Sequence, residues 1–168
     1  MPLTAADLVK LGDVPVAIQS AFFHNIFVRL DGTGVTSATD GGGGTVNAQY
    51  GLGPLTTFKV RAQADGSFAF ESTAFSNVFL RLDGTGVPAS QAGGGKVNAQ
   101  FGAGPYEKYR VLPQTSGTAS FESAAFPGTY LRLVTGSGVT TATGPGGTVN
   151  AQVNADGGEN ETFYFVVA

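Results

Sequence analysis

The chain has 168 residues, no cysteine and a formal net charge of −3 at pH 7. Without cysteine it has no disulfides, thiol catalysis or thiolate metal sites. Its pI near 4.9 argues against nucleic-acid binding, which depends on clustered lysine and arginine. Apolar residues make up 42% of the chain and charged residues 12%, which is typical of a folded domain rather than a disordered one.

The first thirteen residues, 1–13, precede any repeated pattern. Thr4 to Asp7 has the form of a helix capping box, an apolar stretch follows it, and Gly12 supplies a stop. We expect a turn or two of helix that plugs one end of the next domain or, alternatively, binds a partner. No stretch approaches the roughly 18 apolar residues of a membrane helix, and residues 1–13 lack the basic start and apolar run of a secretion signal. We therefore expect no membrane insertion and a cytoplasmic protein, or a secreted one if a signal was removed.

From residue 14 onward, a unit of about 52 residues occurs three times, and a fixed period of this kind indicates a repeat architecture. The phrase FVRLDGTGV at 27–35 returns as FLRLDGTGV at 79–87 and as YLRLVTGSGV at 130–139. A glycine-rich stretch and the letters VNAQ follow each copy. We place the units at about 14–65, 66–115 and 116–168, together forming a single domain over 14–168.

Within each unit, apolar residues recur with a period of two between Gly, Asp, Pro and Ser clusters, which indicates short strands and turns. The first unit has predicted strands at 16–20, 26–31, 45–50 and 57–62. The second has them at 67–72, 78–83, 96–101 and 108–113, and the third at 118–123, 129–134, 148–153 and 162–167. Twelve strands in three equal groups result.

The apolar positions keep the same register in every unit, which predicts three units around one core. Examples are Val28, Leu80 and Leu131; Leu30, Leu82 and Leu133; Ala48, Ala99 and Ala151. Side chains alternate along a strand. We therefore expect Phe79, Arg81 and Asp83 to face outward, where a binding site would lie.

An arginine recurs in the second strand of each unit, and a Gln or Glu recurs in the strand before it. The arginines are Arg29, Arg81 and Arg132; the partners are Gln19, Glu71 and Glu122. One interpretation is a set of cross-strand polar pairs on the outer face, of small energetic value. The other is that the arginines clamp an anion or a carbohydrate.

Asp31 and Asp83 begin Asp-Gly turns, whereas Val134 takes this place in the third unit. An aspartate in such a turn commonly bonds its own backbone. The alternative is a carboxylate that grips sugar hydroxyls, which predicts two competent sites and a degenerate third.

Asn47, Asn98 and Asn150 recur on the third strand of each unit, and each is followed two residues later by a glutamine that is also expected to face outward. Amides both donate and accept hydrogen bonds, so they suit either neighbouring loop backbone or a polyol ligand. The glycine-rich stretches at 40–44, 92–95 and 144–147 are predicted hairpin loops. They lack the lysine and the strand-to-helix context of a phosphate-binding loop, so we do not expect nucleotide binding.

His24 is the only histidine, and Ser76 and Pro127 occupy the matching positions in the other units. The sequence places no Ser and Asp beside it, and no carboxylate pair, triad or metal cluster can be located. We therefore expect no catalytic residue, no metal and no cofactor, and a protein that is not an enzyme.

Three four-stranded units fit a β-trefoil, a six-stranded barrel capped by three hairpins. The segment VNAQFGAGPYEKYRV at 97–111 resembles the fascin-type (actin-crosslinking) trefoil pattern, and YLRLDG-like openings are similar to those of fascins and fibroblast growth factors. The resemblance covers residues 14–168 and implies an all-β trefoil and actin binding. Ricin-type trefoil lectins carry Q-x-W, and this chain has no tryptophan. Sugar stacking would therefore need Tyr106, Tyr130 or another Tyr or Phe.

The sequence thus predicts a non-enzymatic, lectin-like module that recognises carbohydrate through repeated shallow surface sites. The candidate ligand-binding residues are Asp31, Asp83, Asn47, Asn98, Asn150, Arg29, Arg81 and Arg132. Two alternatives stay open: a fascin-like module that binds actin, and an interaction scaffold or inhibitor, because trefoils serve unrelated functions. The expected partner is a carbohydrate or a protein.

Overall fold

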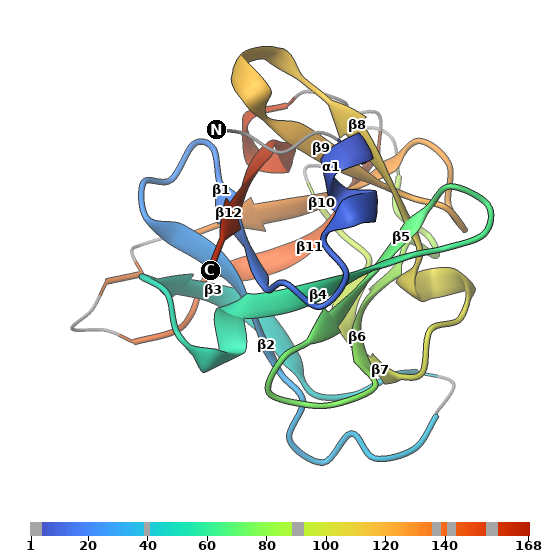
Figure 1. Ribbon diagram of the computed structural model, residues 1–168. Helices are drawn as coiled ribbons and strands as arrows, with labels where there is room; N and C mark the ends of the chain where they lie inside the picture. The colour runs from blue at the N-terminus through green and yellow to red at the C-terminus, as the bar shows by residue number, and fades with distance from the viewer. Residues whose placement is uncertain (1–4, 39–40, 89–92, 136–138, 141–143, 154–157) are drawn as a thin grey trace.

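The computed structural model describes residues 5–38, 41–88, 93–135, 139–140, 144–153 and 158–168 (Figure 1). One short helix, α1 (Ala5–Lys10), precedes the strands. The first unit holds β1 (Val16–Ser20), β2 (Ile26–Asp31), β3 (Thr45–Tyr50) and β4 (Thr57–Ala62). The second holds β5 (Phe68–Ser72), β6 (Val78–Asp83), β7 (Lys96–Phe101) and β8 (Tyr109–Pro113). The third holds β9 (Ala119–Ser123), β10 (Thr129–Val134), β11 (Thr148–Val153) and β12 (Phe163–Val167).

The first and fourth strands of each unit close a six-stranded barrel. Around the ring, β1 pairs with β4, β4 with β5, β5 with β8, β8 with β9, β9 with β12, and β12 with β1, all antiparallel. The remaining strands form three hairpins, β2–β3, β6–β7 and β10–β11. Predicted and observed strand bounds differ by at most one residue, so the period-two prediction is confirmed.

The three hairpins meet in a ring, because the glycine-rich loop of each unit pairs with the third strand of the next. Isolated bridges join Gly43 to Ala99, Gly94 to Ala151, and Gly146 to Ala48. Both backbone bonds of the first bridge are short, at 2.8 and 2.7 Å between nitrogen and oxygen. The loops predicted as simple hairpin connections therefore also hold neighbouring units together.

Aromatic side chains fill the centre of the barrel at equivalent positions of the three units. Phe58, Tyr109 and Phe163 are fully buried, as are Phe70 and Phe121. The ring centroids of Phe70 and Phe121 lie 5.1 Å apart. Large buried aromatic rings dominate core energetics, so this cluster explains why the aromatic register recurs along the sequence.

The predicted N-terminal helix is present as α1, and it lies beside β4 and β8. Its Leu8 is 1% exposed and belongs to the core. A 2.6 Å ion pair between Asp13 and Arg61 fixes the chain where it enters the barrel. The proposed capping residue, Thr4, lies outside the described residues.

The expectation that Phe79 and Arg81 face outward is wrong. Their exposed fractions are 6% and 3%. Strand β6 has the core on one side, and its other side is covered by the loop of the first unit and by η2 (Pro105–Glu107), the 3₁₀ turn before β8. Alternation along the strand therefore separates two buried faces rather than a core face from a solvent face.

Candidate functional site

An arginine on the second strand of each unit bonds an asparagine directly opposite it on the third strand. The Nη1 to Oδ1 distances are 3.3 Å for Arg29–Asn47, 3.2 Å for Arg81–Asn98 and 3.2 Å for Arg132–Asn150. The register places each pair directly across the hairpin. Six of the predicted site residues thus form three equivalent pairs.

The cross-strand pair predicted between these arginines and Gln19, Glu71 or Glu122 is wrong. Glu71 lies opposite Phe79, and its carboxylate instead accepts from Arg61 at 2.8 Å and from the Asn77 backbone N–H at 2.7 Å. Glu122 accepts from the Gly128 backbone N–H at 2.7 Å. These glutamates stabilise the turn between the first two strands of their units, where Asn77 and Gly128 have positive φ.

The second unit surrounds its arginine with more polar groups than the others do. Arg81 lies 3.5 Å from Asp83 and 3.9 Å from Glu107, and its guanidinium carbon stands 5.1 Å from the centroid of the Tyr106 ring. The distance of 5.1 Å is within reach of a cation–π interaction.

Each of the other units lacks one of the two carboxylates. In the first, Arg29 lies 3.6 Å from Asp31, but Thr56 stands in place of Glu107. In the third, Arg132 lies 3.7 Å from Glu161, but Val134 stands in place of Asp83. The threefold repeat therefore carries three chemically different versions of one arrangement.

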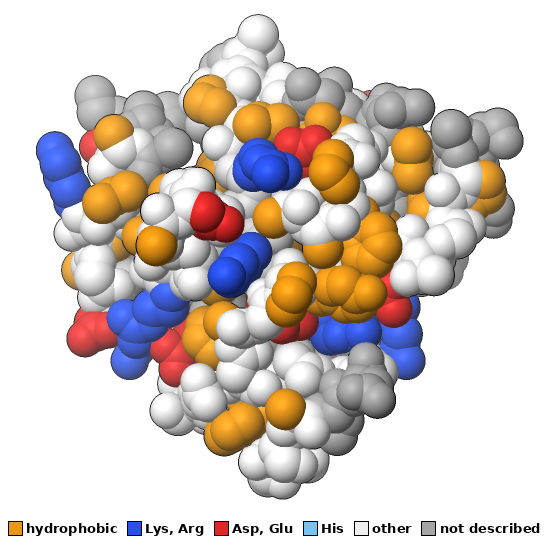
Figure 2. All heavy atoms as spheres, turned by 90° about the vertical axis from the view of Figure 1, so that its right-hand side faces the viewer, with side chains coloured by type: hydrophobic (Ala, Val, Ile, Leu, Met, Phe, Trp, Pro, Cys, Tyr) orange, Lys and Arg blue, Asp and Glu red, His pale blue; other side chains and the backbone are white. Residues whose placement is uncertain are grey.

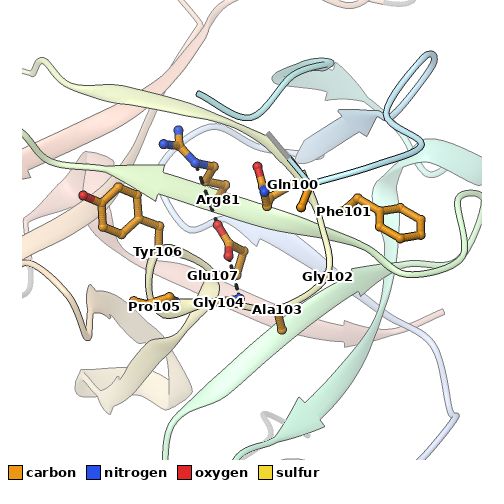
Figure 3. Close-up of a pocket in the computed structure, with 10 residues that line it drawn as sticks. Arg81, Gln100, Phe101, Gly102, Ala103, Gly104, Pro105, Tyr106 and Glu107 are labelled. Carbon is orange, nitrogen blue, oxygen red and sulfur yellow. Dashed lines mark hydrogen bonds and ion pairs between the residues drawn. The ribbon is translucent and has the colours of Figure 1, made fainter. Parts of the chain in front are cut away.

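Glu107 is positioned by the turn that contains it. The Gly104 backbone N–H donates to Glu107 Oε1 at 2.7 Å, which closes η2 and aims the other carboxylate oxygen at Arg81. Burial raises the pKa of Glu107 above its ordinary value, although the Gly104 N–H and Arg81 oppose that shift. The close-up shows this carboxylate pointing toward Arg81, with Tyr106 beside them (Figure 3).

A pocket of about 500 Å³ opens over this arrangement. Its lining combines the charged and polar groups with apolar surface, from Ala38, Arg81, Gln100, Phe101, Gly102, Ala103, Gly104, Pro105, Tyr106 and Glu107. Figure 2, turned to the side where β5 lies in Figure 1, shows hydrophobic side chains gathered right of centre above acidic and basic ones. The volume lies within the roughly 300–1,000 Å³ typical of small-molecule pockets.

The pocket draws on two units of the repeat. Ala38 belongs to the loop between β2 and β3, whereas the other lining residues belong to the second unit. The same loop lies against the Arg81–Asn98 pair, because Asn98 Nδ2 donates to the Gly41 carbonyl at 2.9 Å. The alternative in which this asparagine satisfies a neighbouring loop is therefore confirmed.

Asp31 and Asp83 bond their own turns. Each carboxylate accepts from the backbone N–H of Thr33 or Thr85 at 3.0 Å and from its hydroxyl at 2.6 Å. These threonine hydrogen bonds lower the pKa of both aspartates, so each remains a carboxylate at neutral pH. The backbone-bonding role is confirmed for both.

Of the predicted site residues, Arg81 lines the pocket. Asn98 accepts a hydrogen bond from Arg81, and Asp83 forms an ion pair with it. Asn98 is 4% exposed. The equivalent residues Asp31, Arg29, Asn47, Arg132 and Asn150 belong to the other two units and lie outside this pocket. The structure therefore concentrates the candidate chemistry in the second unit.

Two lining residues, Glu107 and Gln100, were not predicted as site residues. Among the described residues, Gln100 Oε1 is a buried side-chain acceptor without a hydrogen-bond partner. Its equivalents are bonded: Gln49 Nε2 donates to the Gly51 carbonyl, and Gln152 Oε1 accepts from the Gly93 N–H. Glu107 could have been found from the sequence by aligning the turns before the fourth strands. In that alignment Glu107 matches Thr56 in the first unit and Glu161 in the third.

His24 is exposed and outside the pocket. Across the described ranges, no group of three or more His, Cys, Asp or Glu side chains has the arrangement of a metal site. In the same part of the chain, no helix is long and apolar enough to cross a membrane.

The comparisons with known proteins concern the fold. No family model and no curated protein matches the chain. The designed threefold-symmetric protein ThreeFoil superposes with a TM-score of 0.67 at 15% identity, covering 92% of this chain and 99% of that one. The Polyporus squamosus lectin, bound to a human-type influenza-binding epitope, gives 0.62 at 17% identity, covering 92% and 49%.

SeviL, solved with the asialo-GM1 saccharide, gives a TM-score of 0.63 at 11% identity and covers 93% of this chain and 98% of that one. At these identities the likeness shows the fold and leaves the resemblance to fascins a prediction. Together with the closed barrel and its three hairpins, these superpositions establish that the chain is a β-trefoil.

Proposed function

We propose that this protein is a non-enzymatic, lectin-like module whose principal carbohydrate site is the pocket of the second unit. The observation that carries the proposal is the convergence of a guanidinium, a carboxylate, an amide and an aromatic ring on one pocket of about 500 Å³. A pyranose presents hydroxyls at its edge and C–H groups on its faces. A largely apolar pocket with a few convergent polar groups suits a ligand of this kind.

Each side chain has a distinct task in this proposal. The Arg81 guanidinium donates hydrogen bonds, the Glu107 carboxylate accepts them, and the Gln100 amide offers an acceptor that bonds no other described residue. Tyr106 forms a rigid wall, because its ring is held by Phe126 at 5.0 Å between centroids and by the Arg81 cation. Buried ion pairing fixes these groups before a ligand arrives, which reduces the ordering cost of binding.

The solved neighbours give this proposal general support. The Polyporus squamosus lectin and SeviL were both solved with a bound saccharide on this fold. Fascin-like actin binding, the alternative expectation, has weaker support, since Arg81 faces two carboxylates and the chain has nine Lys and Arg against twelve Asp and Glu.

A printed glycan array tests the proposal with matched variants. We expect the wild-type chain to bind a set of saccharides and Tyr106→Ala to lose that binding. Leu55→Ala, at the equivalent position in the first unit, should retain it. Folding of each variant is checked by circular dichroism. Silence of the wild-type chain across the array, together with co-sedimentation with filamentous actin, would replace carbohydrate binding with the fascin-like alternative.

A further inference from the structure

A second hollow, of about 240 Å³, lies where the first unit meets the third unit and the end of the second. It is lined by Ala21, Phe22, Thr115, Thr118, Glu159 and Thr162. These residues come from the β1–β2 turn, the β8–β9 connection and the 3₁₀ turn η4 (Glu159–Glu161) with the residue after it. None of them lines the pocket of the second unit.

Phe22 is exposed without a structural need. Its exposed fraction is 56%, and among the described residues its ring contacts that of Phe23, edge-on, at 4.9 Å between centroids. The turn that carries it is held by Ser20, whose hydroxyl accepts from the Phe22 and Phe23 backbone N–H groups. Ser72 holds the second unit's turn in the same way, with Ala74 at the Phe22 position. The turn therefore forms without an aromatic residue there.

The groups around the ring offer hydrogen-bond acceptors. Thr118 donates its hydroxyl hydrogen to the Thr115 carbonyl at 2.8 Å, and Thr162 donates to the Gly158 carbonyl. Each hydroxyl oxygen thus keeps acceptor capacity. The Ala21 N–H donates to the Thr162 carbonyl at 3.0 Å. This backbone hydrogen bond joins the turn that carries Phe22 to the segment that carries Thr162.

Glu159 sets the charge of the hollow. Among the described residues of the lining it alone is ionisable, and its carboxylate has no hydrogen bond or ion pair to another described residue. Glu161 lies near enough for its carboxyl to be affected by the Glu159 charge. The Glu159 carboxylate would therefore repel an anionic ligand, whereas the hydroxyls of an uncharged ligand could donate hydrogen bonds to it.

We propose that this hollow is a second binding site, for one ring of an uncharged saccharide. The C–H face of the sugar packs on Phe22, and its hydroxyls donate to Glu159 and the threonines. The volume is smaller than that of pockets for drug-sized ligands, which suits a single ring. This site is separate from the pocket of the second unit and does not depend on the function proposed for it.

The absence of tryptophan from the chain provides a direct reporter. In Phe22→Trp, the only indole stands on the hollow, and its emission is titrated with lactose, maltose and N,N′-diacetylchitobiose. We expect a saturable blue shift with at least one of them, because the indole loses contact with water. Glu159→Gln in this background should raise the half-saturating concentration about tenfold, as for the loss of a charged hydrogen bond.

Two controls test whether the fluorescence response comes from this hollow. One excludes a response of any exposed indole, and the other excludes binding at the pocket of the second unit. Val9→Trp carries an indole at another exposed apolar position, 61% exposed, and should not respond. Adding Tyr106→Ala to Phe22→Trp should leave the response unchanged, since that change removes the second unit's pocket alone. No shift with any of the three sugars, or an equal shift in Val9→Trp, would overturn the second site and leave the first proposal untouched.

Discussion

Arg81 is surrounded by three groups, each of which lies nearest a different nitrogen of its guanidinium. Nη1 donates to Asn98, Nη2 faces Asp83 and Nε faces Glu107. Its side chain is 3% exposed and that of Glu107 4%, so removing one partner leaves a buried charge. Breaking a buried pair in this way is far more destabilising than breaking a surface pair.

Arg81→Met tests this pair. We expect it to lower the free energy of unfolding by about 3 kcal/mol, because the Glu107 carboxylate is then buried without its cation. Urea denaturation at pH 7 measures the change. Arg81→Met combined with Glu107→Gln should recover part of the loss, and Arg29→Met, in the unit without the second carboxylate, should cost less. Equal losses for Arg29→Met and Arg81→Met would contradict the role given to Glu107.

Glu161 makes stability depend on pH in a defined direction. Burial, with Glu159 adding to it and Arg132 opposing it, raises the pKa of Glu161 from 4.5 to about 7. The folded chain therefore holds this proton more tightly than the unfolded chain. Its contribution to stability is complete below about pH 4.5 and is lost as the pH rises to about 7.

Glu161→Gln removes this titration. Between pH 4.5 and 7.5, the stability of the wild-type chain should fall relative to the variant by on the order of 3 kcal/mol, at about 1.4 kcal/mol for each unit of pKa difference. Urea denaturation of both proteins at several pH values gives the difference directly. A difference that stays constant with pH would show that Glu161 titrates normally.

At the scale of elements, the glycine-rich loops position the next unit's arginine. Gly42 has a φ of +63°, and a Cβ built there would lie 2.7 Å from Asn98 Oδ1 and 2.8 Å from Arg81 Cδ. Gly93 approaches Arg132 of the third unit in the same way. Pro145 takes this place in the third unit's loop, so the loop beside the first unit differs from the other two.

Gly42→Ala should disturb the pocket from the neighbouring unit. We expect a loss of about 1–2 kcal/mol, because a side chain at positive φ is strained and this one also displaces Arg81. Saccharide binding at the second unit's pocket should weaken in parallel. The matched control is Gly41→Ala, since a Cβ at Gly41 meets no atom within 4 Å. If the two variants behave alike in urea denaturation and in saccharide binding, the loop does not position the arginine.

At the scale of the whole molecule, the sequence predicted the twelve strands and their threefold arrangement. Period-two alternation and the repeated Val28, Leu80 and Leu131 positions carry that information locally. The site was predicted only in part. Arg81 was a candidate, but its partner was misassigned, because burial of the second face of β6 comes from a loop of the first unit and from η2, which strand alternation does not reveal.

The repeated residues do not reveal how the pocket of the second unit differs chemically from the other two units. The repeated residues selected from the sequence include Asp31 and Asp83, which bond their own turns, and Asn98, which bonds a loop. The residue that distinguishes the second unit, Glu107, lies in the short turn before β8, where the three units differ most clearly in chemistry. Arg81 and Gln100 recur in every unit, so what distinguishes the candidate site is the departure from the repeat at Tyr106 and Glu107.

The most direct test of the central claim, that the second unit's pocket binds saccharide, is an NMR titration of the ¹⁵N-labelled chain with the strongest array ligand. We predict saturable shifts of the amide signals of Ala38 and of the non-proline residues in Gln100–Glu107, with the equivalent first-unit signals in Gln49–Thr56 unmoved. Shifts of equal size in both units, or shifts confined to residues outside the pocket, would contradict the claim.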